Sequence, residues 1–174
     1  MSKRKIEDII NDAFVFVEGE QKLEERANAL DFIAHLRESE IEVPLGEGIG
    51  EAIYKGEVVC YVGIESPGTG DTALIIFNDQ VPGTWVTWGE HSTQPENVPE
   101  HIKKIVWENV KTCDIENCGG DCKPGMRKKV LGKEFDSLCV SSLMFDNPSG
   151  DALECVKLMV DARKRDILKN TERT

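Results

Sequence analysis

The spacing of apolar residues changes along this chain, and that change restricts the fold more than any other feature of the sequence. Near the N-terminus apolar side chains recur every three or four positions, beginning with Ile6, Ile9 and Ile10, as they do on one side of an amphipathic helix. Gly19 interrupts this pattern, and a second helical stripe follows it. The second stripe is predicted to comprise Leu23, Ala27, Leu30, Ile33, Ala34 and Arg37.

In the middle of the chain the apolar residues recur at every second position, which is typical of strands with one buried face. Val58, Cys60 and Val62 alternate in this way, and the dipeptide Lys55-Gly56 before them is typical of a hairpin turn. Further strands are predicted at 72–78 and 84–88, and residues 128–131 and 134–145 are predicted to form either two strands or one long strand bent near Gly132. Further helices are predicted from about 99 to the loop that begins at Cys113, and from about 152 to 169.

This order of elements predicts an α+β protein. Because short turns join successive strands, we expect an antiparallel sheet of about five or six strands, with helices packed on one face. Residues 1–40 form the predicted N-terminal helical pair, and residues 45–174 form the α+β domain. A connector rich in proline and glycine separates them, and we expect the two parts to form one compact unit.

The charge balance excludes several classes of protein. The chain has 32 acidic and 21 basic residues and a formal net charge of −11, so general binding to nucleic acid is not expected. No apolar run reaches the ~18 residues that a membrane span needs. Acidic residues soon after the basic N-terminus interrupt any signal-peptide core, so we expect a cytoplasmic protein with reduced thiols.

Three of the six cysteines lie in one loop, which we call the cysteine loop (113–125). Zinc prefers four thiolate or imidazole ligands, and Cys113, Cys118, Cys122 and Cys139 are the predicted set. His91 and His101 are alternative ligands. Basic side chains such as those at 127–129 favour the thiolate form of a neighbouring cysteine, so a redox role is a second interpretation. Plain reduced cysteines in a surface loop are the third, since the loop lacks paired CxxC motifs.

The remaining candidates for chemistry are weaker. Cys60 and Cys155 lie at apolar positions of a predicted strand and helix, so we expect them in the core. None of the three histidines belongs to a known catalytic motif. The sequence therefore does not indicate an enzyme.

The aromatic residues Tyr61, Phe77, Trp85 and Trp88 gather on the predicted strands. If they share one face, they could bind an apolar cation or another small apolar ligand. Glutamates 57, 65 and 90 would stand at the rim of such a site. Aromatic packing between neighbouring strands explains the same residues without a ligand.

Several segments resemble small bacterial domains of the YdhG type, whose function is unknown. These are Gly56-Glu57-Val58-Val59, Gly132-Lys133-Glu134-Phe135, Phe145-x-Asn147-Pro148 and Arg163-Lys164. The resemblance covers about residues 58–167 and implies an antiparallel sheet flanked by helices. Members are described as iron-chaperone-like or as neighbours of ligand-sensing domains, and no agreed catalytic residues carry over. The N-terminal helical pair and the cysteine loop depart from the pattern.

Together these features predict a cytoplasmic domain that binds a small molecule or a protein partner and has no evident catalytic residues. The alternative is a zinc-dependent or thiol-dependent redox protein centred on the cysteine loop. The N-terminal helices also provide a surface through which a homodimer could form.

Overall fold

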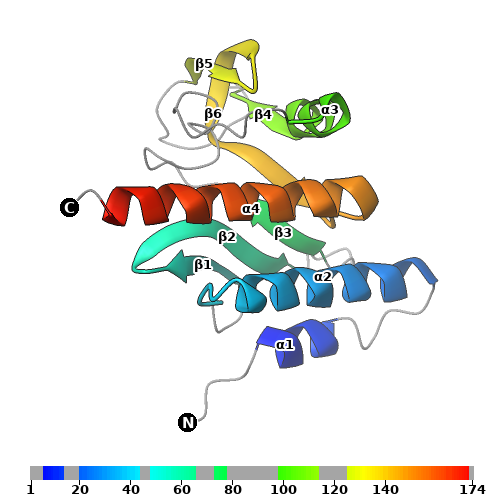
Figure 1. Ribbon diagram of the computed structural model, residues 1–174. Coiled ribbons are helices and arrows are strands. Elements are labelled where there is room, and N and C mark those ends of the chain that lie inside the picture. Colours follow the sequence, from blue (N-terminus) through cyan, green and yellow to red (C-terminus); the bar gives the residue numbers. More distant parts are fainter. Residues whose placement is uncertain are drawn as a thin grey trace.

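The computed structural model describes residues 6–13, 20–43, 48–65, 73–77, 98–113 and 125–172. Within these residues lie four helices and six strands (Figure 1). In chain order they are α1 (Ile6–Ala13), α2 (Glu20–Glu38), β1 (Gly48–Tyr54), β2 (Glu57–Glu65), β3 (Ala73–Phe77), α3 (Glu100–Glu108), β4 (Val110–Thr112), β5 (Met126–Val130), β6 (Lys133–Asp146) and α4 (Gly150–Thr171). The predicted α+β class is confirmed.

All the strand pairings are antiparallel, and the strand order is β1-β2-β3-β6-β4, with β5 also paired to β6. The C-terminal end of β6 pairs with β3, whereas the rest of β6 pairs with β4 and β5. Figure 1 shows β6 curving between these two regions. The prediction of one sheet of about five or six strands is therefore wrong in part, because the antiparallel strands form two parts that share the long strand β6.

Two tight turns join successive strands, and the sequence predicts the one at Lys55-Gly56. Lys55 and Gly56 join β1 to β2 with φ angles of 51° and 82°, and Leu131 and Gly132 join β5 to β6 with 46° and 87°. Positive φ at both central residues is typical of the type I′ turn, whose twist matches that of antiparallel strands. Of the two alternatives predicted near Gly132, the structure has two paired strands and not one bent strand.

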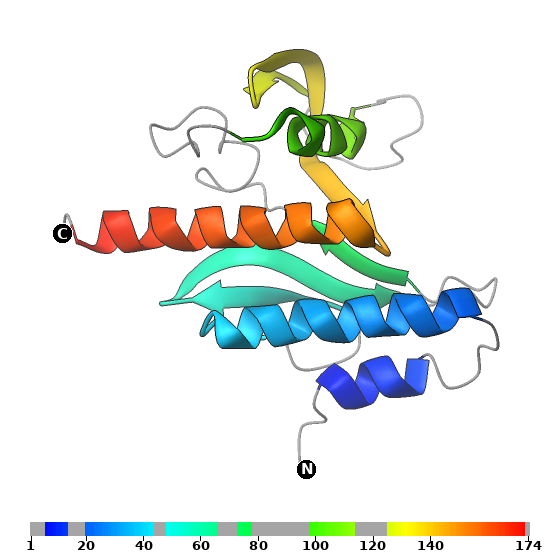
Figure 2. The ribbon, with the colours of Figure 1, turned by 45° about the vertical axis from the view of Figure 1, so that its right-hand side comes forward.

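Helices α2 and α4 lie side by side on one face of β1, β2 and β3 (Figures 1 and 2). The strand residues on that face are buried, and the cross-strand register places them in neighbouring rows. They are Ala52, Cys60, Val62, Leu74, Ile76 and Phe145. The buried side chains of α2 and α4 join them in the core, so these two helices and the sheet share one hydrophobic cluster.

The predicted stripe of the second helix needs correction. Leu23, Ala27 and Ala34 of that stripe are exposed, whereas Phe32 and Leu36 of the same helix are fully buried. Apolar residues occur on several sides of α2, so helical spacing alone did not identify the side that meets the sheet. The buried side of α2 is defined by Ala29, Phe32, Ile33 and Leu36.

One predicted helix is shorter than expected, and one predicted strand cannot be compared with the structure. The sequence predicts that the helix beginning near 99 continues until the cysteine loop, but α3 ends at Glu108 and Val110 begins the short strand β4. Asn109 follows the helix, and its N–H bonds back to the carbonyl groups of Ile105 and Val106. The strand predicted at 84–88 lies outside the described residues.

Candidate functional site

A row of residues crosses the face of the sheet that the helices leave uncovered, and we call it the outer row. Glu51 on β1 is the Cα partner of Tyr61 on β2, and Tyr61 is the partner of Phe77 on β3. On β6, Met144 is the partner of Phe77 and completes the row. Residues directly opposite each other on antiparallel strands share a face. The register thus places two of the four predicted aromatic ligand-binding residues, Tyr61 and Phe77, in one row.

The outer row contains a polar contact. The Tyr61 hydroxyl donates a hydrogen bond to Oε1 of Glu51, at 3.1 Å. Tyr61 is half-buried and Glu51 is exposed. Ile49, two residues before Glu51 on β1, is 44% exposed. Trp85 and Trp88, the other two predicted ligand-binding residues, lie outside the described residues.

Both ends of the cysteine loop meet β6 at the same place. The N–H of Cys113 donates to the carbonyl of Ser137 on β6, at 2.8 Å. A Cβ atom added to Gly125 would lie 2.5 Å from the Cβ of Cys113 and nearer still to the Ser137 hydroxyl oxygen. Because real Cβ atoms do not approach so closely, position 125 accepts only glycine without movement of its neighbours.

Two of the four predicted zinc ligands lie near this meeting point. Cys139 follows Ser137 by two residues on β6, and side chains two residues apart on a strand share a face. Cys113 and Cys139 are both half-buried. Cys118 and Cys122 lie outside the described residues, as does His91, and His101 is exposed on α3. In the part of the chain that the structure describes, no three Cys, His, Asp or Glu side chains are grouped as a metal ion requires.

The other two described cysteines are core residues. Cys60 and Cys155 are both fully buried, as the sequence predicts. Burial raises the pKa of the Cys155 thiol to about 12, and it raises the pKa of the Cys60 thiol even further. Both thiols therefore stay protonated near neutral pH, which makes them poor nucleophiles and poor metal ligands.

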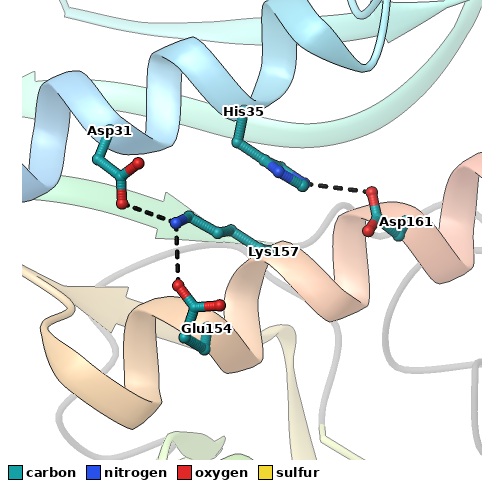
Figure 3. A network of polar contacts seen from close by, with 5 residues as sticks. All are labelled: Asp31, His35, Glu154, Lys157 and Asp161. Carbon is teal, nitrogen blue, oxygen red and sulfur yellow. Dashed lines mark hydrogen bonds and ion pairs between the residues drawn. The ribbon is translucent and has the colours of Figure 1, made fainter.

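A line of polar contacts joins α2 to α4, and we call it the helix seam (Figure 3). The Lys157 ammonium donates to Oδ2 of Asp31 at 2.6 Å and to Oε1 of Glu154 at 2.9 Å. One turn further along both helices, Nε2 of His35 lies 3.1 Å from Oδ1 of Asp161. From the first contact to the second, the residue numbers rise along both helices, from 31 to 35 on α2 and from 157 to 161 on α4. Helices α2 and α4 therefore run parallel.

A third contact lies where α2 ends. The Lys164 ammonium donates to the carbonyl of Ser39, at 2.5 Å, and lies 4.8 Å from the centroid of the Tyr54 ring. Carbonyl groups at a helix C-terminus lack partners within the helix and carry partial negative charge. The lysine satisfies one of these groups and connects α4, α2 and β1.

The helix seam holds α2 and α4 together through ion pairs and hydrogen bonds. A histidine paired with a carboxylate activates a side-chain nucleophile only if that nucleophile lies within hydrogen-bond reach. Among the described residues, no serine, threonine or cysteine side chain is hydrogen-bonded to His35. The carboxylates of Asp31 and Glu154 are already hydrogen-bonded to Lys157.

Sequence reasoning missed the helix seam. Asp31 and Lys157 are 126 residues apart, and no local spacing indicates that they meet. The only local signal was the pair Glu154 and Lys157, whose i, i+3 spacing suits an ion pair on one helix.

Comparisons with known proteins do not identify a family for this chain. The chain matches no protein-family model, and the curated proteins and the solved structures yield no match either. The resemblance to YdhG-type domains therefore stays a prediction. Among the described helices, none is both long and apolar enough to cross a membrane.

The pH dependence of the free energy of unfolding of a Lys157 variant tests the helix seam. Burial lowers the pKa of the Lys157 ammonium, but its hydrogen bonds to Asp31 and Glu154 and their charges raise that pKa by more. Because the folded-state pKa is above the ordinary value, the stabilisation is present at neutral pH and is lost as pH rises through that pKa. We expect Lys157→Met to lower the free energy of unfolding by about 1 kcal/mol at neutral pH.

Urea unfolding of the parent chain and of Lys157→Met at a series of pH values measures the difference between their free energies of unfolding. It should be constant from neutrality to about pH 10 and should shrink above that. Lys169→Met, at an exposed position of the same helix, is the control and should change little. A difference between Lys157→Met and the parent chain that is as large at about pH 11 as at neutrality would contradict the assignment.

Proposed function

We propose that this chain is a binding domain and that the outer row binds a small apolar cation. The observation that carries the proposal is the contact between Tyr61 and Glu51, which joins an aromatic ring to an exposed carboxylate on one sheet face. The opposite face of these strands is occupied by α2 and α4 (Figure 2). A ligand on the outer row would therefore leave the hydrophobic core undisturbed.

The chemistry of the outer row favours a cation with an apolar body. The Glu51 carboxylate attracts positive charge, and the face of the Tyr61 ring adds cation–π attraction. The exposed Ile49 side chain offers apolar surface beside them. The net charge of −11 raises the concentration of cations near the protein and repels anions.

Thermal unfolding with paired probes tests this proposal. Benzyltrimethylammonium and other apolar amines should raise the melting temperature, because a ligand that binds only the folded state stabilises it. Benzyl alcohol, which is neutral, should have a much smaller effect. We expect Glu51→Gln to weaken amine binding by about tenfold, since it removes the charge and keeps the shape. Tyr61→Ala should weaken it at least as much.

Glu108→Gln is the matched control, because Glu108 is also an exposed carboxylate but lies on α3. It removes the same charge and should leave amine binding unchanged. If no amine in the panel shifts the melting temperature, or if both glutamate variants respond alike, the outer row is not a cation site. Binding of a protein segment to this face that Tyr61→Ala abolishes would identify a protein partner instead.

A zinc site at the cysteine loop is the second candidate function. It is supported by the position of Cys113 and Cys139 beside the point where the loop leaves β4 and returns at Gly125. A thiol-dependent redox role for the same cysteines is the alternative.

Elemental analysis of protein purified without chelator distinguishes these functions. A zinc site predicts about one equivalent of zinc per chain, lost in Cys113→Ser and in Cys139→Ser because each removes a thiolate ligand. Cys155→Ala, which alters a buried core cysteine, should keep the metal. Zinc-free protein whose thiols pair reversibly under mild oxidation would favour the redox role. Zinc-free protein with inert thiols would contradict both.

A further inference from the structure

A second row of residues lies beside the outer row on the same face of the sheet. Ile49 on β1 is the Cα partner of Gly63 on β2, and Gly63 is the partner of Ile75 on β3. On β6, Asp146 is the partner of Ile75 and ends the row. Each of these residues lies two positions along its strand from a member of the outer row, and residues two positions apart on a strand share a face. Both rows therefore cross the face that α2 and α4 leave uncovered.

Asp146 places a second carboxylate on this face, in addition to that of Glu51. Asp146 is exposed, whereas the preceding residue, Phe145, is fully buried in the core on the opposite face. Within the part of the chain that the structure describes, neither carboxylate forms an ion pair, and Glu51 accepts the hydrogen bond from Tyr61. The carboxylates of the helix seam differ, because each of them meets a lysine or a histidine. The face thus carries two negative charges that the described side chains do not neutralise.

The sequence supplies no basic side chain on the strands of this face. No lysine or arginine lies between Lys55 and Lys103, a stretch that includes β2 and β3. The strand β1 and residues 143–146 of β6 contain none either. The chain has 21 lysine and arginine residues in all, so their absence here is a local property. An acidic surface without cations of its own attracts cations from solution.

The two carboxylates lie too far apart to bind one small cation. The strands β2 and β3 separate β1 from β6, and neighbouring strands are about 4.8 Å apart. Glu51 and Asp146 also lie in different rows, which adds about 7 Å along the strands. Their Cα atoms are therefore about 16 Å apart. A ligand that meets both carboxylates must be long and must carry a positive charge at each end.

We propose that the ligand of this face is a linear diammonium compound, with one ammonium group at Glu51, the other at Asp146, and an apolar chain across β2 and β3. This assignment rests on the proposed cation site and names the class of its ligand. Each ammonium group donates charge-assisted hydrogen bonds to one carboxylate. Tyr61 lies next to Glu51 in the outer row, so its ring adds cation–π attraction at that end.

Isothermal titration calorimetry of the full-length chain with three amines tests the proposal. Low ionic strength is used because salt screens exposed charges. Diaminodecane should bind at least about tenfold more tightly than decylamine, which has the same apolar chain and one charge, because its second ammonium group binds within the complex already formed. Diaminobutane has both charges but is too short to reach from one carboxylate to the other, so it should show no such gain.

Asp146→Asn removes the second charge and keeps the shape of the side chain. In this variant diaminodecane should bind no more tightly than decylamine, and decylamine should bind as it does to the parent chain. Asp136→Asn is the matched control, because Asp136 is another exposed aspartate of β6 but lies where that strand pairs with β5. It should leave the advantage of diaminodecane unchanged. Glu51→Gln should weaken the binding of both amines.

The results distinguish failure of the diammonium assignment from failure of the cation site. If no amine binds to the parent chain, the cation site is absent and both proposals fail. If decylamine and diaminodecane bind equally tightly, or if Asp146→Asn and Asp136→Asn have the same effect, the cation site stands and the diammonium assignment is overturned. A gain for diaminobutane as large as that for diaminodecane would also overturn it, because charge and not length would then decide the affinity.

Discussion

The burial of α4 on several sides is the interaction on which the rest of the structure depends. Cys155, Val156, Met159 and Val160 follow closely along this helix and are all fully buried, so more than one face of α4 is covered. Helix α4 contacts α2, α3 and β2, and Arg163 extends these contacts by donating to the carbonyl of Val58 at 3.2 Å. Complete burial of an apolar side chain contributes about 1.5–3 kcal/mol, so this helix contributes a large share of the hydrophobic stabilisation.

The helix seam determines how α2 is placed against α4. Parallel neighbouring helices bring ends of like partial charge together, which is unfavourable. The contacts of Lys157 and Lys164 offset this, because one ammonium lies between carboxylates and the other meets the negative end of α2. With α2 fixed, its buried side covers the sheet, and α1 packs on α2 away from α4. The outer row lies on the far face of the sheet.

Local patterns in the sequence predicted most of the elements, because strand alternation, helical spacing and turn residues act over a few positions. The α+β class, the hairpin at Lys55 and Gly56, and the buried face of α4 follow from such patterns. The buried side of α2 and the short strand β4 did not, since tertiary packing selects between several apolar sides and overrides the helical tendency at Val110. The contact of Tyr61 with Glu51 and the helix seam depend on cross-strand register and on helix pairing, which no local pattern specifies.

Adjacent residues of α4 provide the most direct test of the claim that its burial holds the fold together. Met159 is fully buried, whereas Leu158 is 46% exposed. Urea unfolding of Met159→Ala should show a loss of about 2–5 kcal/mol, because the substitution removes apolar contacts and leaves a cavity. Leu158→Ala should change the free energy of unfolding by no more than about 0.5 kcal/mol. Equal losses in the two variants, or a larger loss for Leu158→Ala, would contradict the central position of α4.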